Sequence, residues 1–212
     1  MDDIKVETKM MPPFYKNGYL IINESLSQCI YLDPGDEVAL ILELIRTRGI
    51  DLIAVVNTHA HIDHICGISS VLQVWDVPIY LHPKDRLLYE SLPEQGQMFG
   101  LEYDPAPPVD EELKDGQELI LADLSIKVHF TPGHSPGHVC LEIGQHLFCG
   151  DTIFQGSVGR TDLPGGSHET LMRSIQDRIL PLGDSKILYP GHGPKTTIGH
   201  ERMTNPFILQ ND

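Results

Sequence analysis

The sequence predicts an α/β fold, and three observations support this prediction. The chain has 212 residues, of which 41% are hydrophobic and 21% charged, which is typical of a globular chain that buries a core without disulfides. Segments with strand character alternate with amphipathic helical segments over short connections. Residues 52–57, LIAVVN, form a nearly continuous apolar run, which is typical of a strand buried on both faces. We expect a single domain over residues 1–212.

The first half of the chain is expected to contribute five strands, at residues 4–9, 18–23, 28–33, 52–57 and 77–81. Asp33-Pro34-Gly35 has the composition of a turn. An amphipathic helix is expected to begin at Asp36 and to end at Gly49, because apolar residues recur at helical spacing between them. Further helices are expected over residues 63–75 and 83–92.

Residues 93–110 differ from the segments around them. They hold four prolines and two glycines, together with Met98 and Phe99. Loops of this length in compact domains are usually functional or disordered. We predict a long loop or lid here, whose apolar residues either cover a functional cleft or only stabilise the fold.

The second half of the chain is richer in short strands. They are expected at residues 118–121, 125–131, 138–143, 146–149 and 186–189. A helix is expected to begin at Ser167, and a short helix to follow Gly199.

The segment Thr58–His64, THAHIDH, has the spacing of metal ligands. In an extended turn, His59 and His61 point to the same side, because side chains alternate with a period of two. Asp63 and His64 stand at the start of the next helix and can turn toward a second ion. Imidazoles with few carboxylates suit Zn²⁺, Fe²⁺ or Mn²⁺ better than Ca²⁺ or Mg²⁺. The sequence therefore predicts a metal site after the buried strand.

Two ions need more ligands than this segment supplies. His134, Asp151 and His192 each follow an expected strand in a loop that contains glycine. Strand ends running into such loops are where α/β proteins place their sites. These three residues are therefore the expected additional ligands.

Taken together, the H-x-H-x-D-H segment, the loop His134, Gly150-Asp151 and Gly191-His192 resemble the metallo-β-lactamase superfamily. Residues 150–154, 159–162 and 189–194 are similar to the small bacterial glyoxalase II-like hydrolases, also called hydroxyacylglutathione hydrolase-like. The resemblance implies a four-layer αβ/βα sandwich of two mixed β-sheets with metals at one edge.

The resemblance also implies a set of ligands for two divalent ions, with Zn²⁺ preferred and Fe or Mn as alternatives. His59, His61 and His134 would hold the first ion. Asp63, His64 and His192 would hold the second, and Asp151 would bridge them.

The implied activity is hydrolysis of a thioester of the S-lactoylglutathione type, or of a related ester, by a hydroxide that bridges the metals. The partner is then a small thioester molecule, which a glutathione group would carry. Asp63 would orient the water and take its proton. Arg160 is expected either to bind a substrate carboxylate or to form an ion pair with Asp162.

Other activities stay open. Persulfide dioxygenases share this fold and a similar G-R-T-D stretch but use one iron. A non-catalytic protein and a nuclease are weaker alternatives. Lactam hydrolysis is disfavoured, because true β-lactamases of this fold usually lack equivalents of the Asp63-His64 pair combined with a bridging aspartate. Full-length glyoxalase II enzymes add a helical domain that contacts glutathione, whereas 20 residues follow His192 here.

The net charge and the cysteines indicate which partners and which cellular compartment to expect. With 15 Lys+Arg against 30 Asp+Glu, the net charge of −15 argues against broad binding to nucleic acid or to anionic membranes. The polar N-terminus does not resemble a signal peptide. The four cysteines show no C-x-x-C pairing and are expected to be reduced and mostly buried. A cytoplasmic enzyme is therefore expected, with no prediction of its oligomeric state.

The remaining histidines are expected to have structural roles. His138 is expected to support the site or to lie in the core. Five others are expected to be surface or satisfied structural residues: His82, His129, His146, His168 and His200.

Overall fold

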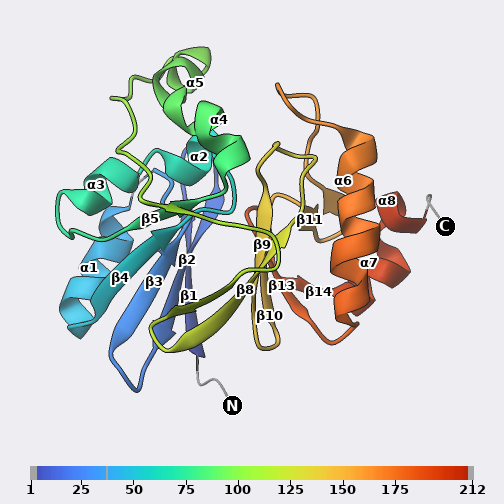
Figure 1. Cartoon of the computed structure of the whole chain (residues 1–212), viewed down its shortest axis with the longest axis horizontal. Helices are drawn as coiled ribbons and strands as arrows, with labels where there is room; N and C mark the ends of the chain where they lie inside the picture. Colours follow the sequence, from blue (N-terminus) through green and yellow to red (C-terminus); the bar gives the residue numbers. More distant parts are fainter. Residues whose placement is uncertain (1–3, 37, 210–212) are drawn as a thin grey trace. The chain divides into compact units, whose positions relative to one another are not determined.

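The computed structural model describes residues 4–36 and 38–209, and the chain divides into two compact units. Unit 1 comprises Met1–Leu113 and Ile120–Leu124, and unit 2 comprises Lys114–Leu119 and Ser125–Asp212. Among the described residues, two sheets have six strands each, and a short hairpin forms a third sheet (Figure 1). The predicted α/β architecture with two mixed sheets is confirmed.

The first sheet has the strand order β1-β2-β3-β4-β5-β6. Its strands are β1 (Ile4–Met11), β2 (Lys16–Asn23), β3 (Gln28–Leu32), β4 (Asp51–Val56), β5 (Ile79–Leu81) and β6 (Glu111–Glu112). The first three strands pair antiparallel, and β3 to β6 pair parallel. The sheet is therefore mixed, and β4 coincides with the apolar run that predicted a buried strand.

The helices of unit 1 are α1 (Ala39–Arg48), α2 (Ile62–Ile65), α3 (Ile68–Leu72), α4 (Arg86–Glu90) and α5 (Leu92–Met98), with a 3₁₀ turn at Pro83–Asp85. Helix α1 begins three residues later than expected. It ends as expected at Gly49, whose φ of 61° is left-handed and favours glycine. Figure 1 shows α1 and α3 along the same sheet.

The helix expected over residues 63–75 is two helices, α2 and α3, separated at Gly67. The N–H of Gly67 donates to the carbonyl of Pro34 rather than to a carbonyl of α2. A Cβ at Gly67 would collide with the carbonyl oxygen of Gly35. The turn after β3 therefore packs directly on this point, and the long-range contact interrupts the helix that periodicity predicted.

The expected loop over residues 93–110 is helical at its start, because α5 extends to Met98. Pro93 lies in the first turn of α5, where the missing N–H costs no helical hydrogen bond. Residues 101–110 form neither helix nor strand. Tyr103 anchors this stretch by donating its hydroxyl to Asp36 Oδ2 at 2.8 Å. The lid role of the segment stays a prediction.

The second sheet has the order β14-β13-β10-β9-β8-β7. Its strands are β7 (Glu118–Leu121), β8 (Leu124–Phe130), β9 (Val139–Ile143), β10 (His146–Gly150), β13 (Ile187–Pro190) and β14 (Thr196–Thr197). Strands β10 and β13 pair parallel, whereas the β8–β9, β9–β10 and β13–β14 pairs are antiparallel. The hairpin β11 (Ile153–Phe154) and β12 (Ser157–Val158) stands apart from this sheet.

The helices of unit 2 are α6 (His168–Ser174), α7 (Ile198–Thr204) and α8 (Pro206–Leu209), and α6 continues into a π-helical turn at Ile175–Ile179 and a 3₁₀ turn at Leu180–Leu182. Ser167 caps α6 as predicted, because its Oγ accepts from the N–H of Thr170.

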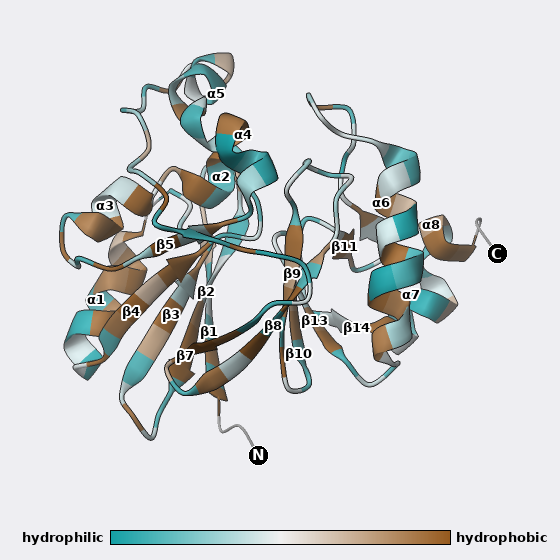
Figure 2. Ribbon diagram, in the orientation of Figure 1, coloured by the Kyte–Doolittle hydropathy of each residue, from teal (hydrophilic) through white to brown (hydrophobic). Residues whose placement is uncertain are grey.

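Each unit has its own apolar core, and the strands in Figure 2 are correspondingly rich in hydrophobic residues. Cys29 and Cys66 lie in the core of unit 1, and Cys140 and Cys149 in that of unit 2. All four thiols are free and buried, as predicted. Burial raises the pKa of the Cys66 thiol to about 12. Among the described residues, no helix combines the length and apolarity that crossing a membrane requires.

Candidate metal centre

In unit 1, the segment Thr58–His64 begins just after β4 and runs into α2. His59, His61 and His64 are all buried. The ring of His59 lies 4.9 Å from that of His61 and 4.0 Å from that of His64, measured between centroids. The structure therefore brings these three predicted ligands together around His59.

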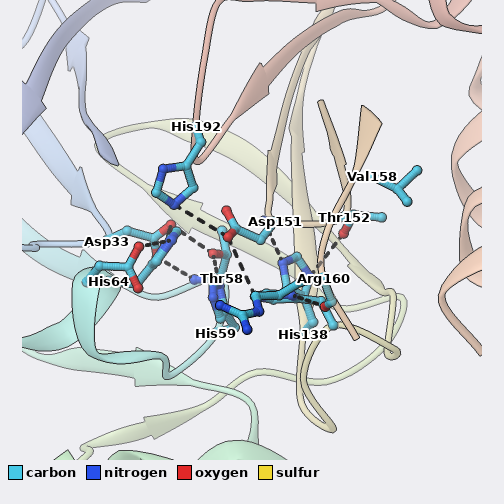
Figure 3. A network of polar contacts seen from close by, with 12 residues as sticks. Asp33, Thr58, His59, His64, His138, Asp151, Thr152, Val158, Arg160 and His192 are labelled. Carbon is cyan, nitrogen blue, oxygen red and sulfur yellow. Dashed lines mark hydrogen bonds and ion pairs between the residues drawn. The ribbon is translucent and has the colours of Figure 1, made fainter. Parts of the chain in front are cut away.

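Asp33, at the end of β3, orients two of these histidines (Figure 3). His64 donates from Nδ1 to Asp33 Oδ2 at 3.0 Å. The hydroxyl of Thr58 donates to the same carboxylate oxygen at 2.8 Å and lies 3.1 Å from His59 Nδ1. In both histidines Nδ1 therefore carries the proton, which His64 donates to Asp33 and His59 donates to the Thr58 hydroxyl. Nε2 is then the nitrogen with the lone pair. This is the tautomer that a metal ligand needs.

Further contacts fix the main chain of this segment. The N–H of Thr58 donates to Asp33 Oδ1 at 2.7 Å, and Asn57 Nδ2 donates to the carbonyl of His64 at 3.0 Å. The N–H of Ala60 donates to the buried carboxylate of Asp85 at 3.1 Å. Asp63 Oδ2 lies 3.5 Å from His64 Nε2. The predicted unit 1 ligands are therefore held on a strand end whose main chain is pinned by side chains.

In unit 2, the three predicted ligands follow different strands. Asp151 and His192 follow the ends of the parallel neighbours β10 and β13, and the N–H of Gly191 donates to the carbonyl of Gly150 at 2.8 Å. His134 lies in the loop between β8 and β9. Asp151 Oδ2 is 3.6 Å from His134 Nε2 and 3.6 Å from His192 Nε2 (Figure 3). One carboxylate oxygen therefore faces both imidazoles.

Each of these two separations fits a pair of atoms bound to the same ion better than it fits a hydrogen bond. A hydrogen bond between such atoms is normally shorter than about 3.2 Å. Two ligand atoms on a tetrahedral zinc ion, with bonds of about 2.1 Å, lie about 3.4 Å apart. His134 also donates from Nδ1 to the carbonyl of Arg160 at 2.7 Å, so its Nε2 carries the lone pair. The donor set of unit 2 therefore fits divalent metal ions.

His138 supports Asp151, which is one of the two roles that the sequence left open. The N–H of Asp151 donates to His138 Nε2 at 3.0 Å. His138 Nδ1 lies 3.1 Å from Thr131 Oγ1 and 3.2 Å from Thr152 Oγ1. The fully buried ring therefore fixes the main chain of the central carboxylate.

Arg160 makes the ion pair that the sequence offered as one of its two roles. Its Nε and Nη2 donate to the two carboxylate oxygens of Asp162, both at 2.7 Å. These hydrogen bonds lower the pKa of Asp162 to about 2. Both side chains are exposed, so binding of a substrate carboxylate by Arg160 stays a prediction.

Sequence reasoning missed the residues that orient the ligands from a distance. The sequence places Asp33 in a turn and indicates no role for it at the site, although an aspartate at a strand end followed by Pro-Gly is a usable signal. Asp85, which holds the main chain at Ala60, has no local signal in the sequence.

Comparison with known proteins supports the geometry. Residues 11–192 match the family described as the Metallo-beta-lactamase superfamily. The chain belongs to this superfamily. Hydroxyacylglutathione hydrolase GloC of Haemophilus influenzae is 37% identical over 214 residues, which cover 97% of this chain and 98% of that protein.

Two solved structures are also similar. BLEG-1 B3 metallo-beta-lactamase has a TM-score of 0.90 at 35% identity, over 96% of this chain and 99% of that one. TTHA1623, in a di-iron-bound form, has a TM-score of 0.87 at 39% identity, over 95% of this chain and 99% of that one. The metallo-β-lactamase fold implied by the sequence motifs is therefore confirmed, and the chain is a metallo-hydrolase of this superfamily.

Proposed function

We propose that this chain hydrolyses a thioester of the S-lactoylglutathione type at a centre of two divalent metal ions. The observation that carries the two-metal centre is the position of Asp151 Oδ2, at 3.6 Å from both His134 and His192. The 37% identity with hydroxyacylglutathione hydrolase GloC over almost the whole chain supports the substrate class. Zinc is the expected metal. Iron is the alternative, because the similar TTHA1623 structure is di-iron-bound.

In this proposal, the ligands are those that the sequence motifs imply. His59, His61 and His134 would hold one ion, Asp63, His64 and His192 would hold the other, and Asp151 would serve both.

When bound, such ions polarise a carbonyl and lower the pKa of water toward neutrality. Asp63 then orients the attacking water and accepts its proton, because a carboxylate at this position has oxygens for both contacts. The C–O bond forms first and the C–S bond then breaks, which gives a carboxylic acid and a thiolate, and the thiolate takes up the proton that Asp63 accepted. The thiolate leaves readily, and no general acid is assigned.

The first test is an assay of the zinc-loaded protein with S-lactoylglutathione, following loss of the thioester absorbance. Hydrolysis is expected, with loss on treatment with EDTA and recovery with Zn²⁺. Asp63→Asn is expected to lower kcat by about 10²- to 10⁴-fold, the usual contribution of a proton-transfer group. Asp76→Asn, at an exposed position, is the matched control. Full activity of Asp63→Asn, or of the metal-free protein, contradicts the mechanism.

The same preparation separates the competing functions. Lactam hydrolysis is a second candidate because of the similarity to BLEG-1 B3 metallo-beta-lactamase, and a chromogenic cephalosporin tests it. A persulfide dioxygenase would contain one iron per chain and take up O₂ with glutathione persulfide. Two metals per chain and turnover of the thioester alone support the proposal. Hydrolysis of the cephalosporin, or one iron per chain with O₂ uptake, contradicts it.

Arg160 is proposed to bind a carboxylate of the substrate. Arg160→Ala is then expected to raise KM with little change in kcat, because the contact is equal in the ground and transition states. Arg173→Ala is the control, since Arg173 also forms an exposed ion pair, with Glu169 at 2.7 Å. An unchanged KM in Arg160→Ala restricts Arg160 to its pair with Asp162.

A further inference from the structure

We infer that Gln95 is a positioning residue that fixes His61 for metal binding and couples helix α5 to the metal segment. The inference rests on the proposed role of His61 as a ligand. Gln95 lies on α5, more than 30 residues along the chain from His61, and belongs to the same unit.

The amide of Gln95 contacts the main chain on both sides of His61. Its Oε1 accepts from the N–H of Ile62 at 2.9 Å, and its Nε2 donates to the carbonyl of Ala60 at 3.1 Å. The two peptide groups that flank His61 are therefore held by one side chain. Because a side chain leaves the main chain between these groups, fixing them also fixes the direction of the His61 imidazole.

His61 needs such support because of its place in the fold. It occupies the N-cap position of α2 with φ −69° and ψ 150°, and its side chain makes no capping hydrogen bond. N-cap positions usually carry Ser, Thr, Asp or Asn, whose oxygen accepts from a main-chain N–H of the first turn. The N–H of Ile62, in that first turn, is instead satisfied by Gln95. The imidazole of His61 therefore does not have to cap α2.

The orientation of the Gln95 amide is itself determined. Nε2 donates a second hydrogen bond to the carbonyl of Leu88 at 2.8 Å, so the NH₂ group faces two carbonyls and the oxygen faces an N–H. A glutamate at this position keeps the acceptor for Ile62 but loses both donors. A methionine fills a similar volume and loses all three hydrogen bonds.

The test is the Zn²⁺ affinity of each ion, measured by competition with a chromophoric chelator. Gln95→Met is expected to lower the affinity for one of the two zinc ions by about 10- to 100-fold, as is usual for residues that support a metal ligand. The affinity for the other ion should change by less than about twofold. Gln95→Glu is expected to lower the affinity for the same ion by a smaller factor. Gln97→Met, on the exposed side of the same helix, is the control and should bind zinc as the wild type does.

A purely structural role predicts a different result. Gln95→Met would then lower the urea midpoint of the metal-free protein while both zinc affinities stayed at the wild-type values, and this would overturn the inference. If Gln95→Met does not fold, unchanged affinities in Gln95→Glu overturn it equally. Wild-type protein that binds two zinc ions without thioester hydrolysis refutes the proposed reaction only. Wild-type protein that binds no zinc refutes both.

Discussion

The two clusters of metal donors are built in opposite ways. In unit 1, all predicted ligands come from one segment of six residues, and carboxylates support it: Asp33 orients the histidines and Asp85 holds the main chain. In unit 2, the ligands follow three different strands, and neutral groups support them: a carbonyl for His134 and an imidazole for Asp151. The arrangement of the unit 1 ligands therefore depends on local spacing and on charged supporting groups. The arrangement of the unit 2 ligands depends on the geometry of the sheet.

This difference has an energetic consequence. A hydrogen bond from an imidazole to a carboxylate is stronger than one to a carbonyl and makes the other nitrogen a better donor to a metal. Loss of a carboxylate that orients a ligand imidazole in unit 1 should therefore weaken metal binding more than loss of a neutral hydroxyl that supports the unit 2 ligands. Variants of the supporting residues test the comparison directly.

The largest effect is expected for Asp33→Asn. The amide offers one acceptor oxygen where the carboxylate receives hydrogen bonds from His64, the Thr58 hydroxyl and the Thr58 N–H. We expect about 10- to 100-fold weaker zinc binding. The free energy of unfolding should fall by about 3 kcal/mol, as when a buried charged contact is broken. Chelator competition and urea denaturation measure the two quantities.

The comparison variant in unit 2 is Thr152→Val. It removes a neutral hydroxyl that lies 3.2 Å from His138 Nδ1, and should cost about 1 kcal/mol with little change in zinc affinity. Equal losses of zinc affinity in Asp33→Asn and Thr152→Val would show that the charge of the supporting group is unimportant.

A smaller effect is expected at Glu201, a fully buried carboxylate of unit 2. Its oxygens accept from the N–H of Gly156 at 2.8 Å, Asn205 Nδ2 at 2.9 Å and Thr196 Oγ1 at 2.6 Å. All three donors are neutral. Glu201→Leu should therefore lower the free energy of unfolding of the metal-free protein by about 2 kcal/mol, because buried donors lose their acceptor.

Glu201→Gln is the matched variant. The amide retains one acceptor oxygen, and the hydroxyl of Thr196 can rotate to accept from the new NH₂ group, so we expect a loss below about 1 kcal/mol. If urea denaturation gives equal losses for Glu201→Gln and Glu201→Leu, the charge of Glu201 matters, and unit 2 depends on a buried charge as unit 1 does.

The sequence predicts the unit 1 cluster better than its supports, for a physical reason. His59, His61 and His64 lie in one segment, so their spacing alone indicates a common target. The strand ends that carry Asp151 and His192 were also predictable, because adjacent parallel strands end at the same edge of a sheet. These features depend on local periodicity and on general rules of sheet topology.

The features that were missed depend on contacts between distant segments. The helix break at Gly67 results from its packing against the turn at Gly35, and the interaction of Gln95 with Ile62 spans 33 residues. A glutamine in a segment rich in proline and glycine has no local pattern that marks it as a cap for another helix. Such supports become visible only when the chain is folded.

A further small effect is expected at Glu142, where unit 2 has a charged contact away from its predicted ligands. Burial alone raises the pKa of Glu142, but hydrogen bonds from Lys186 and His129 outweigh it and hold the pKa below its usual value of 4.5. A lowered pKa in the folded state contributes stability above pH 4.5, which is lost as the pH falls through the folded value. Glu142→Gln should therefore cost about 1 kcal/mol at neutral pH, and this difference from wild type should shrink on acidification below pH 4.5.

Urea denaturation between pH 3 and pH 7 measures this dependence. Glu169→Gln, which removes the carboxylate of an exposed pair with Arg173, is the control and should show no such trend, because solvent screens exposed ion pairs. Zinc affinity should be unchanged in both variants. If Glu142→Gln weakened zinc binding, a distant anion would act on the unit 2 ligands, and the view that this cluster depends on sheet geometry and neutral partners would fail.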